Sequence, residues 1–188
     1  DVGIEIAQDA RDAIRREAAV EALAIMHVVG DDAQVRMGGD VVFLARTGDE
    51  LLYTEIPPHV HAVLKDSVVT DVHMFARRGP AQAKFTPVEL RELDHSPNVQ
   101  VVVDPEGMEF DQGSMDAINA AKAQRMVVDV LSDWAVRDVD PTPRARIHIH
   151  FLQNPVEILG EDGKVVGLRT ERCLLYTSDA ADEGFGGD

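Results

Sequence analysis

The residues best suited to chemistry are two adjacent arginines, Arg77 and Arg78, which end the apolar run at residues 68–76. A Gly79-Pro80 corner follows them. Arginine keeps its charge at any working pH and presents a planar fork of donors that matches phosphate oxygens. Two arginines together suit a dianionic group, such as the 2′-phosphate that distinguishes NADP from NAD. Spacing alone leaves open a second interpretation, in which both are surface charges that pair with Glu92 or Asp94.

The elements around the arginine pair (Arg77 and Arg78) predict a layered α/β domain. VVTDVHMFA at residues 68–76 is typical of a strand covered on both faces, and NVQVVVD at residues 98–104 predicts a second strand. Between them, Thr86, Pro87 and Glu89 form the pattern of a helix N-cap with a capping box. Alternating strands and helices favour a mainly parallel sheet, which binds ligands beyond the carboxyl ends of its strands. The arginine pair occupies such a position.

The remaining segments extend this architecture. Ser114 should open one long helix through residue 136, with Ile118, Met126, Val130 and Trp134 facing inward. Residues 145–152 alternate as a strand, and an antiparallel hairpin should turn at Asp162-Gly163. Four shorter predictions precede these, namely a helix at residues 8–23, a short strand ending at Gly30, a loop at residues 47–55 and a helix starting near Pro57 and Pro58.

Composition limits the classes of function. The 188 residues carry a formal net charge of −16, which argues against nucleic acid as a partner. No apolar run reaches the roughly 18 residues that span a membrane, and no signal-peptide pattern opens the chain, so we predict a soluble cytoplasmic protein without a membrane partner. His148 and His150 share one strand face. Without a third ligand nearby in the sequence, we interpret them as an exposed face rather than a metal site.

The stretch FARRGPAQAKFTPVELREL closely resembles the NADP-binding domain of the adrenodoxin-reductase-like ferredoxin–NADP⁺ reductases. Their pattern runs V/F-x-R-R-G-P-x-Q-x-x-F-T-x-x-E-L-R-E, and every fixed letter of it is present here. The resemblance continues from about Leu44 to Arg172. It implies a Rossmann-like fold, hydride transfer between NADPH and FAD, and one-electron transfer to a ferredoxin-type iron–sulfur protein.

The resemblance also implies roles for four residues. Arg77 and Arg78 match the pair that binds the 2′-phosphate of NADP(H). Glu89 matches an acid close to the bound nicotinamide nucleotide, and Glu92 matches an acid near the flavin–nicotinamide junction, where we expect a catalytic role. For both acids a structural interpretation stays open, because Glu89 completes the capping box and Glu92 suits a solvated helix face.

The sequence departs from the family in two places. The segments that build the family's FAD domain are absent from these residues, so we expect this chain alone to be inactive. The family's glycine loop, V-G-N-G-N-x-A, is replaced by VVGDDAQVRMGG at residues 28–39. We interpret residues 1–40 as a frameshifted or chimeric reading, with genuine divergence as the alternative. Residues 41–172 are then a fragment of the NADP-binding domain.

The last segment, residues 173–188, begins CLLYTSDAADE, and a coding strand for it matches the adapter of transposase-based sequencing libraries. We therefore expect it to be read-through rather than natural sequence, with an ordinary disordered acidic tail as the alternative. Three functions are compatible with the whole pattern. The first is the NADP(H)-binding portion of the reductase, the second is a non-catalytic nucleotide-binding or interaction module without a working phosphate loop, and the third, more remote, is a receiver-like signalling domain.

Overall fold

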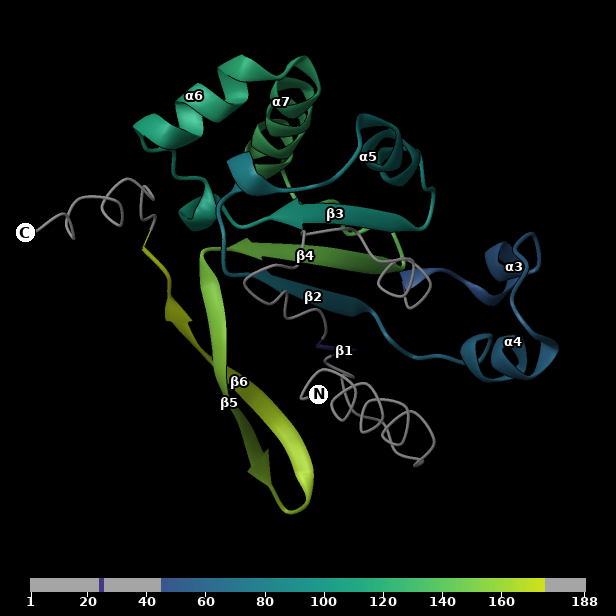
Figure 1. Cartoon of the computed structure of the whole chain (residues 1–188). Helices are drawn as coiled ribbons and strands as arrows, with labels where there is room; N and C mark the ends of the chain where they lie inside the picture. The colour runs from purple at the N-terminus through teal and green to yellow at the C-terminus, as the bar shows by residue number, and fades with distance from the viewer. Residues whose placement is uncertain (1–23, 26–44, 175–188) are drawn as a thin grey trace, which may run out of the picture.

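The structure is a computed structural model that describes residues 24–25 and 45–174 (Figure 1). A central sheet has the strand order β1-β2-β4-β3, and every pair of neighbours in it is parallel. Its strands are β1 (Ala24–Ile25), β2 (Asp71–Ala76), β3 (Val99–Val103) and β4 (Ala145–Phe151). The mainly parallel sheet predicted from the sequence is confirmed. Because all strands run the same way, β2, β3 and β4 end at one edge of the sheet.

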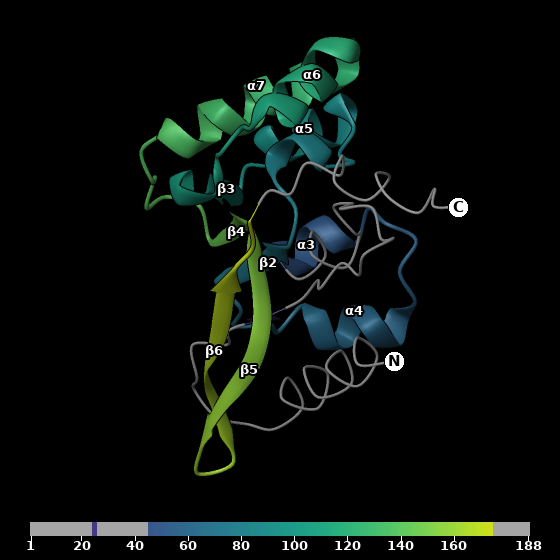
Figure 2. The same ribbon diagram turned by 60° about the vertical axis from the view of Figure 1, so that its left-hand side comes forward.

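Helices α5, α6 and α7 lie together on one side of the molecule, while α3 and α4 lie apart from them (Figures 1 and 2). None of the helices in the described part of the chain has the length and apolar character needed to cross a membrane. The helices are α3 (Gly48–Leu51), α4 (Pro58–Leu64), α5 (Pro87–Asp94), α6 (Gln112–Ala120) and α7 (Lys122–Val136), with the 3₁₀ turns η1 (Pro80–Gln82) and η2 (Pro105–Gly107).

The core lies between one face of the sheet and helices α5 and α7. Burial alternates along β2 and β4, so Val72, Met74, Ile147 and Ile149 face this core and are fully buried. Leu90 and Leu93 of α5, with Val127, Leu131 and Trp134 of α7, pack against them. The prediction that β2 is covered on both faces is therefore wrong. Its second face is half-buried and carries polar residues.

A two-stranded hairpin, β5 (Gln153–Glu161) and β6 (Lys164–Arg172), extends away from the sheet (Figure 2). Asp162 and Gly163 form the turn with φ values of 50° and 74°. Two positive φ values in a two-residue turn are the type I′ geometry, whose twist suits a hairpin and which Asp-Gly favours. The predicted hairpin and its turn are confirmed.

Two predictions about helices are wrong. The helix expected to begin at Ser114 begins at Gln112, with Asp111 as its N-cap, and it ends at Ala120. Ala121 adopts extended backbone angles (φ −132°, ψ 118°), so α7 is a separate helix. Of the residues expected to face inward, Ile118 and Trp134 are buried and Val130 packs against the core, whereas Met126 is exposed. The loop expected at residues 47–55 contains the short helix α3, because Thr47 and Glu50 form a capping box.

The other predictions have mixed outcomes. The helix expected near Pro57 and Pro58 is confirmed as α4, with Pro57 as its N-cap. Only Ala24 and Ile25 of the strand predicted before Gly30 are described. The predicted helix at residues 8–23, the altered glycine loop and residues 175–188 lie outside the described residues.

Candidate functional site: the carboxyl end of strand β2

The arginine pair follows the last residue of β2, at the edge where the parallel strands end. Ala76 is fully buried, whereas Arg77 is half-buried and Arg78 is exposed. The backbone of Arg78 is bonded to the residue that follows β4, because the Leu152 N–H donates to the Arg78 carbonyl oxygen at 3.4 Å. The sheet therefore presents two guanidinium groups at the end where parallel α/β sheets bind ligands.

The loop after the pair is buried and bonded at both ends. Gly79, Pro80 and Ala83 are buried, and the single turn of η1 closes with Gln82 N donating to the Gly79 carbonyl at 3.1 Å. The side chain of Gln124, on α7, donates to the carbonyls of Pro80 at 3.4 Å and Ala83 at 3.2 Å. A loop with its backbone held this way gives the arginines a fixed base.

Helix α5 begins directly after this loop, and its cap is the one that the sequence predicts. The Thr86 N–H donates to Glu89 Oε2 at 2.8 Å, and the Glu89 N–H donates to Thr86 Oγ1 at 3.2 Å. Because Leu90 faces the core, Glu89 and Glu92 are exposed, and their spacing of three places them as neighbours on the helix surface. The structure thus puts both candidate acids on the helix that follows the arginine pair.

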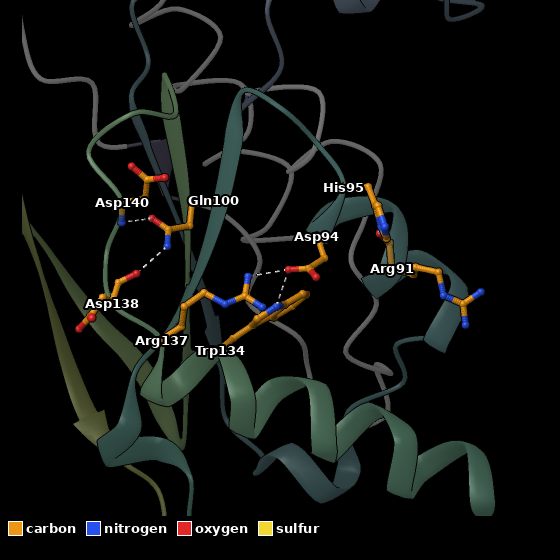
Figure 3. A network of polar contacts seen from close by, with 8 residues as sticks. All are labelled: Arg91, Asp94, His95, Gln100, Trp134, Arg137, Asp138 and Asp140. Carbon is orange, nitrogen blue, oxygen red and sulfur yellow. Dashed lines mark hydrogen bonds and ion pairs between the residues drawn. The ribbon is translucent and has the colours of Figure 1, made fainter.

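Asp94, at the end of α5, has partners other than the arginine pair (Figure 3). Asp94 Oδ1 accepts from Trp134 Nε1 at 3.0 Å and from Arg137 Nη1 at 2.6 Å. The hydrogen bond from Arg137 lowers the pKa of Asp94, and the bond from Trp134 adds to this against burial. Asp94 therefore links α5 to the end of α7. The interpretation of the arginine pair as surface charges had expected Asp94 to pair with those arginines instead.

The same network also fixes the segment after α7. The Gln100 side chain donates to the Asp138 carbonyl at 3.0 Å and accepts from the Asp140 N–H at 2.8 Å (Figure 3). Gln100 is a buried polar residue of β3, and these two bonds satisfy its amide. The network has a structural role. It stabilises the amino-terminal edge of the sheet, which is the edge opposite the arginine pair.

Leu152 is a residue of this site that sequence reasoning missed. Its φ of 57° is left-handed, an uncommon conformation for a branched side chain that nothing in the sequence signals. Its N–H holds the Arg78 carbonyl, and its own carbonyl accepts from the Cys173 N–H at 2.8 Å. Burial raises the pKa of the Cys173 thiol, and the charge of Arg77 opposes this, so the hairpin's end lies near the arginine pair.

The histidines of β4 are not the exposed face that the sequence suggested. The side chains of His148 and His150 are 23% and 21% exposed, and both have carboxylate partners. His73 of β2, which the sequence did not single out, stacks against both. Within the described residues, no group of three histidine, cysteine or acidic side chains is placed to hold a metal ion.

Comparison with known proteins finds relatives among the NADPH-ferredoxin reductases and the NADPH:adrenodoxin oxidoreductases. No model of a known protein family matches the chain. The chain is 39% identical over 133 residues to the NADPH-ferredoxin reductase FprA of Mycobacterium leprae, covering 70% of this chain and 28% of the relative. It is 28% identical over 139 residues to the mitochondrial NADPH:adrenodoxin oxidoreductase of Arabidopsis thaliana, covering 70% of this chain and 29% of that one.

A solved structure agrees with these sequence matches. Mycobacterium tuberculosis FprA in complex with NADPH superimposes with a TM-score of 0.64 at 33% sequence identity. The match covers 74% of this chain and 30% of that structure. The α/β sheet and hairpin described above are thus the counterpart of one part of a longer protein.

Proposed function

We propose that the chain is the NADP(H)-binding portion of an NADPH-ferredoxin or NADPH:adrenodoxin reductase. About 70% of its length is homologous to part of such reductases. One observation carries the proposal. Two adjacent arginines stand at the carboxyl end of a parallel strand, on a buried and hydrogen-bonded loop, in a fold similar to a structure that holds NADPH.

The donor set at this edge fits the nucleotide. Arg77 and Arg78 together supply guanidinium forks that complement the 2′-phosphate, a group that NAD lacks. Hydrogen bonds from Leu152 to Arg78, and from Gln124 to the following loop, hold the backbone in place before the nucleotide binds. The arginine pair therefore loses less conformational freedom on binding. The proposed role of the pair is therefore selection of NADP(H) over NAD(H).

The two acids have separate proposed roles. We assign Glu89, beside the loop, to contact with the bound nucleotide, and Glu92, one turn further along α5, to a catalytic role near the reacting end of the nucleotide. When bound, the reduced nicotinamide would supply a hydride to the FAD of the parent protein, and the two electrons of that hydride would then pass one at a time to a ferredoxin-type iron–sulfur protein. The flavin site belongs to the remainder of the parent, and we propose that this chain alone is inactive.

Retention on immobilised 2′,5′-ADP tests the arginine assignment. A variant with Arg77→Ala and Arg78→Ala should lose retention, and its affinity for NADP⁺ should fall at least about tenfold, because charge-assisted hydrogen bonds to phosphate are lost. Affinity for NAD⁺ should hardly change, since that nucleotide lacks the 2′-phosphate.

The matched control is Arg91→Ala, which removes an exposed arginine of α5 without touching the loop. It should be retained as the unaltered chain is. Unchanged retention of the double variant, or an equal loss of NADP⁺ and NAD⁺ binding, would refute the 2′-phosphate assignment.

A further inference from the structure

Three histidines form a stacked column on the second face of the sheet. The parallel register of β2 and β4 sets His73 beside His148 and Phe75 beside His150. The ring centroids lie 4.4 Å apart for His73 and His148, 5.3 Å for His73 and His150, and 4.7 Å for Phe75 and His150. The ring planes are inclined by 9° to 13° in these three pairs. We call His73, His148 and His150 the histidine column.

Carboxylates terminate the column at both ends. His150 Nδ1 lies 3.3 Å from Asp104 Oδ2, after the carboxyl end of β3. His148 Nε2 lies 2.8 Å from Asp71 Oδ1, at the start of β2. Asp71 also accepts from Thr70 Oγ1 at 2.8 Å and lies 3.8 Å from Arg146 Nη1. The charged groups at the column are thus Asp71, Asp104 and Arg146.

The hydrogen bonds assign the protons of the neutral column. An ionised carboxylate only accepts, so the Nδ1–H of His150 donates to Asp104. The Nε2 of a neutral His150 then carries a lone pair, and the Nδ1–H of His73 donates to it at 3.0 Å. His73 is therefore the Nδ1–H tautomer. If His150 gains a proton, both of its nitrogens donate, and the bond survives only if His73 moves its own proton to Nε2.

A second proton has no favourable place in the column. Protonating His73 as well would set two donors against each other across a 3.0 Å contact. It would also stack two cations, which repel at these separations in a partly dry environment. Burial lowers the pKa of His73 to about 4, and the charges of His148 and His150 add to this, against Asp71. Burial likewise lowers the pKa of His150, although Asp104 opposes it.

We propose that the histidine column is an acid-sensitive element, which stabilises the pairing of β2 with β4 while it is neutral and loses this stabilising effect as it takes up protons in acidic solution. The element adjoins the candidate site, because Phe75 stacks on His150 two residues before Arg77, and Leu152 holds Arg78 two residues after His150. The proposed acid sensitivity does not depend on whether the chain binds the nucleotide.

The direction of the effect follows from proton linkage. Because the folded pKa of His73 lies below its ordinary value of 6.5, the unfolded chain binds more protons than the folded chain below pH 6.5. The contribution of neutral His73 to the stability of the folded chain is complete above pH 6.5 and is lost as the pH falls toward 4. Asp71, whose pKa the His148 and Thr70 hydrogen bonds lower against burial, loses its contribution only in still stronger acid.

Urea unfolding of the full chain at about pH 7.5 and about pH 5 tests the proposal. His73→Asn keeps a side-chain N–H near the position of Nδ1 but cannot titrate. The unfolding constant of the unaltered chain should rise between the two pH values by about 25-fold more than that of the variant, because the pKa of His73 is 6.5 in the unfolded chain and about 4 in the folded chain. His59→Asn, the same change at an exposed residue of α4, should behave as the unaltered chain does.

Nitrogen-15 spectra of the imidazoles give a second reading that needs no variant. His73 should remain neutral and protonated at Nδ1 down to about pH 5. Titration of His73 near its ordinary pKa, an Nε2–H tautomer at neutral pH, or an equal pH dependence of His73→Asn and the unaltered chain would each overturn the proposal.

Discussion

Glu89 shows how one side chain can serve both the fold and the site. Its carboxylate accepts from the Thr86 N–H at 2.8 Å, which satisfies a helix N-terminal donor that would otherwise lack a partner. The same carboxylate lies on the surface of α5, one turn before Glu92 and close to the loop that carries the arginine pair. Capping needs an oxygen acceptor, whereas an electrostatic effect on a nucleotide needs the charge.

Two substitutions of Glu89 separate these roles. Glu89→Gln keeps the acceptor and completes a capping box as well as glutamate does, so the free energy of unfolding should change by less than about 0.5 kcal/mol. Glu89→Ala removes the acceptor and should cost about 1 kcal/mol. Urea unfolding measures both. If Glu89 contacts the nucleotide, both variants should change the affinity for NADP⁺; a change in neither would remove Glu89 from the site.

Local residue patterns were predictable from the sequence, and pairings between distant residues were not. The Thr86–Glu89 cap was recognised because its partners are three residues apart, within one helical turn. His73 and His148 are 75 positions apart, and their stacking depends on β2 pairing with β4, which no local pattern reveals. The left-handed backbone of Leu152 has no sequence signal either, since glycine and asparagine are the residues that usually mark it.

At the scale of elements, the break between α6 and α7 illustrates a tertiary effect that overrides local preference. Residues 114–136 contain neither glycine nor proline, so a continuous helix was the natural prediction. Ala121 is nevertheless extended. Ile118 of α6 packs with Val128 of α7 in a small cluster, while Leu131 of α7 packs in the main core. Asp111, rather than Ser114, caps α6, because its carboxylate accepts from the Ser114 N–H at 2.7 Å.

The turn η2 packs closely against the end of β4, next to the residue that bonds the backbone of Arg78. A Cβ on Gly107 would lie 2.8 Å from the Phe151 carbonyl oxygen and 2.9 Å from its Cβ. Phe151 directly precedes Leu152, whose N–H holds the backbone of Arg78. Glycine at residue 107 is therefore required by space, because the obstructing atoms are mostly backbone and cannot rotate away.

Gly107→Ala should therefore destabilise the chain by about 1 to 3 kcal/mol, the usual cost of forcing an extra carbon into a packed contact. Gly167→Ala is the matched control, because a Cβ there meets only Leu159 side-chain carbons, at 3.5 Å and 3.9 Å. Its effect should stay within about 0.5 kcal/mol, measured by urea unfolding. Equal effects of the two substitutions would show that η2 does not pack against β4 as described.

At the scale of the whole molecule, the strand order explains how much of the site was foreseeable. The sequence predicted a parallel sheet and placed the arginine pair at its carboxyl edge, because strands alternate with helices along the chain. It did not predict that β4, last of the parallel strands in the sequence, lies between β2 and β3. That central position brings His150 to Asp104 and Leu152 to Arg78, so both the histidine column and the support of the arginine pair were missed.

The chain's span relative to its relatives gives the last prediction. It covers 28% of the Mycobacterium leprae reductase, and the proposed flavin site belongs to the remainder of such a protein. Purified without added cofactor, the chain should show no flavin absorbance and no NADPH–ferricyanide activity, yet it should be retained on 2′,5′-ADP, because the arginine pair and its loop lie within one packed unit.

A full-length NADPH-ferredoxin reductase, purified in parallel, is the positive control and should show flavin, activity and retention together. Flavin bound to the chain alone would contradict the assignment of the flavin site to the remainder of the parent. Loss of retention with the sheet intact by circular dichroism would instead contradict both nucleotide-binding interpretations and favour the third, a receiver-like signalling domain. The two outcomes are distinguishable because absorbance and retention are read on the same sample.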